Sequence, residues 1–276
     1  MTVLPELLVV GHVTEDHFGP GQTRLGGAAS YAARAAATLG VRTALVTGAP
    51  PDWPLLRALE GQANLEVHIL PRPVVTTFAL DYTGPVRRLR CTAAAAPIAP
   101  AEIPVPWRRC PVAYLGAVAG ECPGTLADSL ESGFLATGLQ GWMRQFGPDG
   151  SVLATLGPET RDPPVRLRAA TLSVEDHPQA VQLAAELAAR GIVVTITEGA
   201  KGARLFVGAA PPLTIPASPA QEEDPTGAGD VFGVVFALAM ARGRSPEDAA
   251  RLAAHAAASV VEGPGLGRLN ASSLHL

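Results

Sequence analysis

The residues best suited to do chemistry lie near the C-terminus, in the run Asp224-Pro-Thr-Gly-Ala-Gly-Asp230, which an apolar stretch follows. The small residues lead directly into a predicted helix, so the amides of Gly227, Ala228 and Gly229 would be unpaired at its start. Amides at a helix N-terminus bind anions, and the helix dipole adds to this preference. Glycine also allows a phosphate to approach the backbone closely. The run therefore predicts an anion site.

A carboxylate at Asp230 is unexpected in such a site, because it would repel phosphate. It makes sense if Asp230 accepts the proton of a hydroxyl that attacks phosphorus, since a base combined with amides suits phosphoryl transfer. A structural interpretation fits the same residues, with Asp224 as the N-cap, the glycines as a tight turn and Asp230 as a partner of the helix dipole. No Gly-Lys-Ser/Thr follows the glycines, so the run is not a Walker-type loop.

The elements that would position this run alternate between strand and helix along most of the chain. Apolar strands that alternate with helices predict a mainly parallel sheet covered by helices on both faces, which is an α/β fold of three layers. The predicted strands cover residues 7–10, 43–47, 112–115, 134–136, 171–174 and 192–197, and the predicted helices cover 28–39, 55–60 and 179–189.

One segment departs from this alternation. Residues 74–82 and 86–92 are strand-like and only Thr83-Gly84-Pro85 separates them, which is typical of a β-hairpin. We expect this hairpin to form a small flap or lid around residues 74–92, although an antiparallel extension of the main sheet fits equally well. Since no repeat or long linker is visible, residues 1–276 are expected to form one domain with this appendage.

Composition narrows the classes of protein. The chain of 276 residues has a net charge of -4 and only 5% aromatic residues, which argues against a nucleic-acid partner. No apolar run approaches the ~20 residues that cross a bilayer, and the N-terminus lacks the basic residues of a secretory signal. The three scattered cysteines, Cys91, Cys110 and Cys122, suit a reducing compartment. We expect a cytoplasmic protein. An apolar outer face on the hairpin, with Val75, Phe78 and Leu80, would allow two flaps to pair into a homodimer.

Four segments together resemble the motifs of the ribokinase-like (PfkB) carbohydrate kinase family, in the family's order, from about Val9 to Gly265. They are the run ending at Asp230, with Pro225 as a variant; Leu25-Gly26-Gly27-Ala-Ala29; Gly11-His-Val-Thr-Glu-Asp16; and Thr195-Ile-Thr197-Glu-Gly199-Ala-Lys-Gly202. The resemblance implies a ribokinase-like three-layer α/β/α sandwich with a small β lid.

The same resemblance implies an ATP-dependent kinase that phosphorylates a hydroxyl of a small sugar, cyclitol or nucleoside. Asp230 would be the base and Gly227–Gly229 the anion hole. A carboxylate accepts hydroxyl hydrogen bonds, which suits Asp16 in the acceptor site. The remaining implied residues are Gly26 and Gly27 for the acceptor; Thr197, Gly199 and Gly202 for the nucleotide, with His255 and Ser259 on a helix over 248–261; and Asp176, through water, for Mg²⁺.

Some positions depart from the family pattern. Tyr31 stands where many members have an Asn that contacts the sugar, and an aromatic ring there changes the volume of the acceptor pocket. Residues 48–52 replace a Gly-Asp-Asp-x-x-Gly stretch, and Ser173 and Asp176 replace an Asn-x-x-Glu pair. These changes motivate a second interpretation, a non-catalytic sensor of the same fold that binds a sugar or nucleotide, against which the retention of Asp230 and of the anion-hole glycines argues.

The segment Gly138-Leu-Gln-Gly-Trp-Met-Arg144, followed by Pro148-Asp-Gly150, resembles the inositol-kinase branch of the family. In that branch the acceptor is a cyclitol, and Arg144 would reach a substrate or phosphate oxygen; a surface ion pair is an equally good role for it. A Rossmann-type dehydrogenase is excluded, because the turn after Val10 lacks a Gly-x-Gly-x-x-Gly run.

Overall fold

A computed structural model describes residues 4–19, 21–81, 88–263, 266 and 269. Its largest feature is a nine-stranded sheet in the order β15-β14-β13-β12-β9-β8-β1-β4-β5. The neighbours from β13 to β5 are parallel, whereas β14 and β15 are antiparallel at one edge. The strands are β1 Leu7–Val10, β4 Thr43–Ala49, β5 Leu65–Pro71, β8 Val112–Leu115, β9 Phe134–Gly138, β12 Leu167–Ser173, β13 Val193–Thr197, β14 Ala203–Phe206 and β15 Leu213–Ile215.

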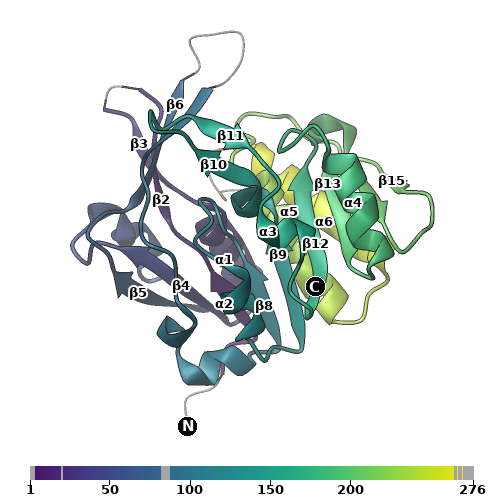
Figure 1. Cartoon of the computed structure of the whole chain (residues 1–276), viewed down its shortest axis with the longest axis horizontal. Helices are drawn as coiled ribbons and strands as arrows, with labels where there is room; N and C mark the ends of the chain where they lie inside the picture. Colours follow the sequence, from purple (N-terminus) through teal and green to yellow (C-terminus); the bar gives the residue numbers. More distant parts are fainter. Residues whose placement is uncertain (1–3, 20, 82–87, 264–265, 267–268, 270–276) are drawn as a thin grey trace.

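Helices cover both faces of this sheet, because its central strands are apolar on both sides. In β1, Leu7 and Val9 pack with α1, α5 and α6, whereas Leu8 and Val10 pack with α2 and α4, and all four side chains are fully buried. Figure 1 shows this arrangement. The predicted three-layer α/β/α fold is confirmed. The helices are α1 Ala28–Thr38, α2 Gly124–Asp128, α3 Pro158–Arg161, α4 Ala180–Ala189, α5 Ala228–Ala241 and α6 Pro246–Val261.

The remaining short elements lie in the connections. The helix predicted over 55–60 is a 3-10 turn, η1 Pro54–Leu59, and the edge strands β5, β14 and β15 were not predicted. The others are η2 Pro100–Glu102, η3 Val105–Arg109, η4 Gln140–Met143 and η5 Gly199–Lys201, with a two-stranded sheet of β10 Arg144–Phe146 and β11 Val152–Ala154.

A separate four-stranded sheet, which we call the lid sheet, projects beyond the large sheet (Figure 1). Its order is β3 Thr23–Gly26, β2 Thr14–His17, β6 Thr76–Asp81 and β7 Arg88–Ala93. Strands β6 and β7 pair antiparallel, and the turn expected at 83–85 lies outside the described residues. The lid sheet is larger than a hairpin, because β2 and β3 contribute half of it. Short polar strands such as Thr-Glu-Asp-His give no apolar alternation by which they could have been found.

The apolar side chains of the lid sheet pack against other residues of the same chain. Phe78 and Leu80 are buried in a small cluster with Val118, and Val75 is 8% exposed. The outer face that was expected to pair two copies is therefore not offered by these residues, and the homodimer stays a prediction.

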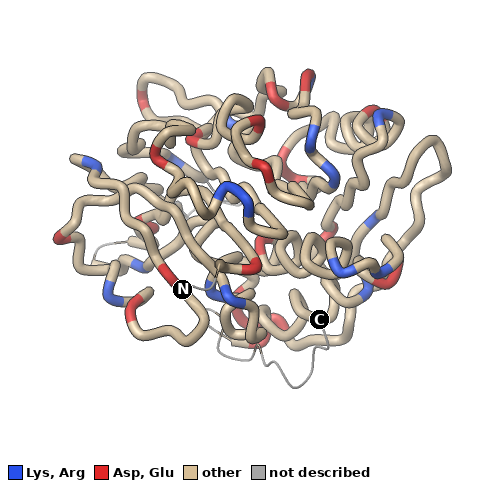
Figure 2. Tube along the Cα trace, turned by 90° about the horizontal axis from the view of Figure 1, so that it is seen from below, with Lys and Arg blue, Asp and Glu red and all other residues tan. Residues whose placement is uncertain are grey.

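Among the described residues, no helix has both the length and the apolar character needed to cross a membrane. Basic and acidic residues are interspersed along the trace in Figure 2.

Helix α5 is held close to the sheet by a contact between Gly233 and Tyr114 of β8. A methyl group on Gly233 would overlap the Tyr114 hydroxyl and lie 3.2 Å from Cζ of its ring. Both residues are buried, so neither can move into solvent.

We expect Gly233→Ala to lower the free energy of unfolding by about 1–3 kcal/mol, because the overlap outweighs the helix propensity that Ala gains. In a Tyr114→Phe background the same change is expected to cost less, since the overlapping oxygen is gone. Denaturant unfolding of the four proteins in this double-mutant cycle measures the coupling. Equal costs in both backgrounds would contradict the contact.

Candidate active site

The glycine-rich run forms the turn that starts α5. Gly227 is the N-cap and has a left-handed backbone with φ 81. The amide of Thr226 donates to the Asp224 carboxylate at 3.0 Å, and the amide of Ala228 donates to Pro225 O at 3.2 Å. Within the described part of the chain, the amides of Gly227 and Gly229 have no hydrogen-bond partner. Two of the three expected anion-hole amides are thus available, and the third is used within the turn.

Asp230 lies in the first turn of α5, three residues after the N-cap. Burial raises the pKa of Asp230 to about 7; the nearby Arg144 cation opposes this rise, and the Asp176 and Asp16 carboxylates add to it. Four charged groups from different elements therefore act on one another here. A carboxyl group with a pKa near neutrality is well matched to general-base catalysis.

The residues that the sequence predicted for the acceptor site also lie close together. Asp16 is on β2 of the lid sheet, and its carboxylate accepts a hydrogen bond from the Thr14 hydroxyl at 2.7 Å. A Cβ on Gly26 of β3 would lie 2.6 Å from Cγ of Asp16, so the carboxyl group of Asp16 packs against this glycine. Gly27 has φ 95 and would clash with the carbonyl oxygen of His12 if it carried a Cβ. Close packing thus accounts for both glycines, by side chains at Gly26 and by backbone at Gly27.

Tyr31 of α1 packs its ring against the glycine turn. A Cβ on Gly227 would lie 2.5 Å from Cγ of this ring. Burial raises the pKa of Tyr31 to about 12, and the Asp16 and Asp230 carboxylates act in the same direction. The phenol therefore stays neutral and lies near the Asp16 and Asp230 carboxylates.

Arg144, the first residue of β10, also lies near Asp230. Its guanidinium donates to Val118 O at 3.2 Å, and its Cζ lies 5.5 Å from the centre of the Phe78 ring in the lid sheet. Its cation lowers the pKa of Asp230 against the effect of burial. Contact of Arg144 with a substrate or phosphate oxygen, and its alternative of a surface ion pair, both stay predictions.

The residues expected on the nucleotide side lie around the β13–β14 turn and on α6. Thr197 ends β13, and Gly199 and Gly202 both have positive φ. The Cβ position of Gly202 is filled by backbone, with Ala217 N at 2.6 Å, so packing alone explains this glycine. On α6, His255 is exposed, and Ser259 donates to His255 O at 3.2 Å.

Helix α6 is joined to the glycine turn, since the amides of Glu223 and Asp224 donate to Val261 O at 2.7 and 3.1 Å. Ser259, in its last turn, is therefore close to that turn in the chain, whereas His255 lies one helical turn further away. Within the described residues, neither side chain forms a hydrogen bond with Asp230.

Asp176 was expected to hold Mg²⁺ through water. Its carboxylate accepts from the amide of Ser173 at 2.7 Å and from the Gln140 side chain at 3.2 Å. Among the described residues, no group of three or more His, Cys, Asp or Glu side chains could hold a metal. Mg²⁺ keeps several waters and needs only one or two carboxylates, so Asp176 acting through water suits a hydrated ion. This role of Asp176 stays a prediction.

Two further residues of the site were not found from sequence. Arg24 of β3 pairs with Asp224 at 3.1 Å and so ties the lid sheet to the glycine turn. Glu121 is 1% exposed and accepts from the amides of His12 at 2.8 Å and Ala119 at 2.7 Å, which fixes the ends of β1 and β8. Glu121 follows Gly120 in what reads as a surface turn, so its burial has no signal in the sequence.

Comparison with known proteins agrees with this geometry. The model of the pfkB family carbohydrate kinases matches residues 166–272, which include the glycine turn, β13 and α6. Inositol 3-kinase of Zea mays is 33% identical over 171 residues, covering 61% of this chain and 44% of that protein. The chain spans 14%, 24% and 44% of the length of three curated relatives that it matches.

Solved structures share the whole fold. A sulfate complex of a pyrophosphate-dependent kinase in the ribokinase family superposes with a TM-score of 0.82 at 19% identity, covering 98% of this chain and 100% of that one. Arabidopsis thaliana ribokinase with ribose and ATP gives 0.69 at 20% identity, covering 99% and 96%. The chain therefore has the fold of the ribokinase family, and its C-terminal part, residues 166–272, is similar to the pfkB family carbohydrate kinases. An inositol kinase is among its relatives, as residues 138–150 suggested.

Proposed function

We propose that the protein is a phosphotransferase that moves a phosphoryl group to a hydroxyl of a small polyhydroxy acceptor, a sugar, cyclitol or nucleoside. The observation that carries this proposal is the position of Asp230. This carboxyl group, with its pKa near 7, lies within one helical turn of two unpaired amides and is close to Asp16 of the lid sheet. A base, an anion site and a hydroxyl acceptor are the parts that such a transfer needs.

In the proposed reaction, Asp16 accepts hydrogen bonds from acceptor hydroxyls and so orients the acceptor. Asp230 takes the proton of the attacking hydroxyl, whose oxygen forms a bond to phosphorus as the bond to the leaving group of the donor breaks. The amides of Gly227 and Gly229, the α5 dipole and Arg144 stabilise the negative charge on the transferred group. Mg²⁺, when bound, would neutralise charge on the donor phosphates.

The acceptor class is supported by the lid side of the site. The Asp16 carboxylate accepts hydroxyl hydrogen bonds, as it does from Thr14, and the Tyr31 ring lies near it. We favour a cyclitol, with the relation to inositol 3-kinase as support.

Two phosphate donors are supported, each by a different observation. The ribokinase with bound ATP shares the fold, and Thr197, Gly199, Ser259 and His255 lie on the elements expected beside a nucleotide. The pyrophosphate-dependent kinase superposes with a higher TM-score, 0.82 against 0.69. We propose ATP as the donor and pyrophosphate as the second candidate.

The test is a panel of acceptors, myo-inositol, ribose and adenosine among them, each with Mg²⁺ and either ATP or pyrophosphate. Phosphorus NMR identifies the phosphorylated product, and the loss of ATP or pyrophosphate identifies the donor. Product from one acceptor, absent without the protein, is the expected result. Thermal stabilisation by an acceptor or ATP without product from any pair would instead support a non-catalytic sensor.

A further inference from the structure

The four places where the described chain crosses between the nine-stranded sheet and the lid sheet meet around one residue, His12. His12 lies between β1 and β2, Gly27 between β3 and α1, Arg72 between β5 and β6, and Ala96 after β7. The carbonyl oxygen of His12 lies where a Cβ of Gly27 would be, and both His12 and Arg72 bond to the carbonyl oxygen of Ala96. Nothing in the proposed chemistry uses this cluster, which we call the crossing cluster.

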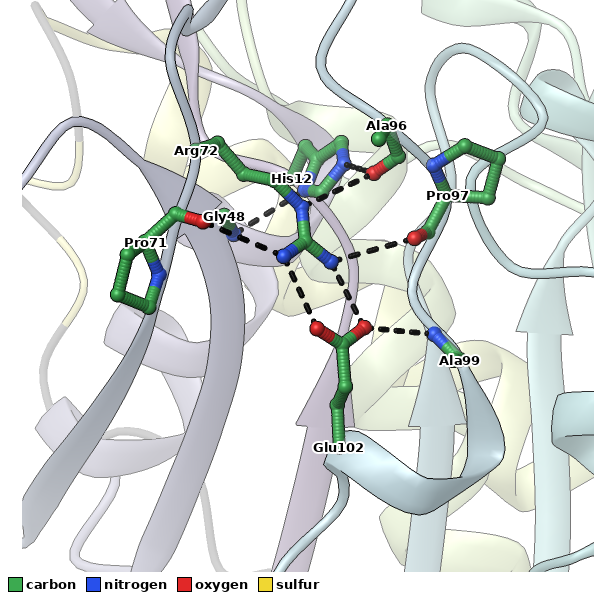
Figure 3. Close-up of polar contacts among 8 residues, drawn as sticks. All are labelled: His12, Gly48, Pro71, Arg72, Ala96, Pro97, Ala99 and Glu102. Atoms are coloured by element: carbon green, nitrogen blue, oxygen red, sulfur yellow. Dashed lines mark hydrogen bonds and ion pairs between the residues drawn. The ribbon is translucent and has the colours of Figure 1, made fainter.

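His12 connects the core to the segment that leaves the lid. Its ring is fully buried, and its Nδ1 accepts from the amide of Gly48 in β4 at 3.1 Å. Since Nδ1 is an acceptor, we assign the proton to Nε2, which donates to Ala96 O at 3.0 Å. A neutral ring thus satisfies both partners (Figure 3).

All three guanidinium nitrogens of Arg72 donate hydrogen bonds within the crossing cluster (Figure 3). Its Nε donates to Ala96 O at 3.3 Å, and its two terminal nitrogens donate to Pro71 O at 3.3 Å and Pro97 O at 3.2 Å. The terminal nitrogens also hold both oxygens of Glu102, at 2.9 and 2.7 Å. The Arg72 side chain is only 11% exposed. A planar fork makes these contacts at once, and a lysine ammonium cannot.

Glu102, which ends η2 in the segment after β7, is the last member of the crossing cluster. Its carboxylate accepts from the amide of Ala99 at 2.8 Å, and the hydrogen bond from Arg72 is the main reason that the pKa of Glu102 is lowered. The segment from Ala96 to Glu102, which carries the chain away from the lid, is therefore fixed to β5 through one arginine.

We propose that Arg72, together with His12, is a positioning residue that sets the orientation of the lid sheet, and with it Asp16, relative to Asp230. This inference rests on the proposed function, in which Asp16 and Asp230 act on the same acceptor. Asp16 is four residues beyond His12, and β2 pairs with β6, which starts four residues beyond Arg72. Rotation about the crossing cluster therefore displaces Asp16, and a shift of about 1 Å can cost ~10²-fold in rate.

Two measurements test this role on Arg72→Lys, which keeps the charge and loses the fork. Amide hydrogen exchange followed by mass spectrometry is expected to be at least tenfold faster in lid peptides covering 74–80 and 89–93, and unchanged in 112–115 and 231–241. The apparent KM for the acceptor that the wild-type protein phosphorylates, myo-inositol being the first probe, is expected to rise about tenfold, with the KM of the donor within twofold.

The matched control is Arg109→Lys, which removes the fork of an exposed arginine whose Nε pairs with Glu131 at 2.8 Å. It is expected to match the wild type in both measurements. If Arg72→Lys does not fold, Glu102→Gln takes its place, because it weakens the same fork while keeping one carbonyl oxygen, and the same exchange pattern is expected.

Exchange in the lid at the wild-type rate would overturn the proposal, and so would equal acceleration in lid and core, because that indicates general destabilisation. If the wild-type protein phosphorylates none of the acceptors, the proposed function fails. The exchange pattern still decides whether Arg72 orients the lid sheet.

Discussion

Asp230→Asn is expected to lower kcat by ~10²–10⁴-fold or more while the acceptor and donor still bind, because the amide cannot take the proton of the attacking hydroxyl. In the wild-type protein, burial raises the pKa of Asp230 to about 7, so the base is ionised only above that pH. The rate with the wild type is therefore expected to fall as the pH is lowered through about 7. Single-turnover kinetics from pH 5 to pH 9 measure both effects.

The control is Asp162→Asn, which makes the same change at a side chain that is 95% exposed. It is expected to leave kcat and its pH dependence unchanged. A rate for Asp230→Asn within tenfold of the wild type, or an acid limb that persists in it, would show that another group is the base.

The same substitution has an effect on stability with a definite sign. The pKa of Asp230 is higher in the folded protein than the ordinary value of 3.8, so the folded state holds its proton more tightly than the unfolded chain. The resulting stability is fully present below about pH 4 and is lost as the pH rises through about 7. Asn does not ionise, so the Tm of Asp230→Asn minus that of the wild type is expected to increase between pH 4 and pH 7. A structural N-terminal carboxylate would give the opposite trend.

Sequence alone predicted the layered fold well, because each apolar strand and each helix leaves a local pattern in the sequence, and their alternation along the chain is typical of this fold. The strands of the central sheet lie where the sequence placed them, and differ mainly at their ends: 134–136 extends to Gly138, and 171–174 starts at Leu167. The edge strand β5 was missed, although its half-buried residues Leu65, Val67 and Ile69 alternate with polar ones, which is the pattern of a half-buried strand.

The site was predicted in part, and the division has a physical reason. Asp230 and the glycine turn are contiguous, so their geometry follows from one helix start. Asp16 comes close to Asp230 from the lid sheet, and its position depends on the long-range pairing of β2 with β6. Tyr114 and Arg24 act through neighbours far along the chain, and no spacing within the sequence reveals such partners.

The glycines show what cannot be predicted from the sequence. A sequence pattern cannot separate a glycine that a ligand needs from one that the fold needs. The structure can, because the Cβ position of Gly202 is filled by backbone and that of Gly227 by the Tyr31 ring, whereas a Cβ on Gly229 would have nothing within 4 Å.

Gly227→Ala is expected to lower the free energy of unfolding by about 2–5 kcal/mol, since two costs add. A Cβ at this position would lie 2.5 Å from Cγ of Tyr31, and overpacking of this kind costs about 1–3 kcal/mol. Gly227 also has φ 81, a left-handed conformation that costs a residue with a Cβ about 1–2 kcal/mol. Denaturant unfolding measures this loss, and activity is expected to fall with it.

Gly229→Ala separates the anion site from the fold. Its Cβ would meet no atom within 4 Å, and in the first turn of α5 Ala is favoured over Gly by up to about 1 kcal/mol. We therefore expect a Tm equal to or above that of the wild type. Kinase activity, however, is expected to fall at least tenfold, because the new methyl group occupies the space through which a phosphoryl group approaches the Gly229 amide. A stable Gly229→Ala protein with wild-type kinetics would show that no phosphate binds at this amide, and the glycine turn would then be only a helix start.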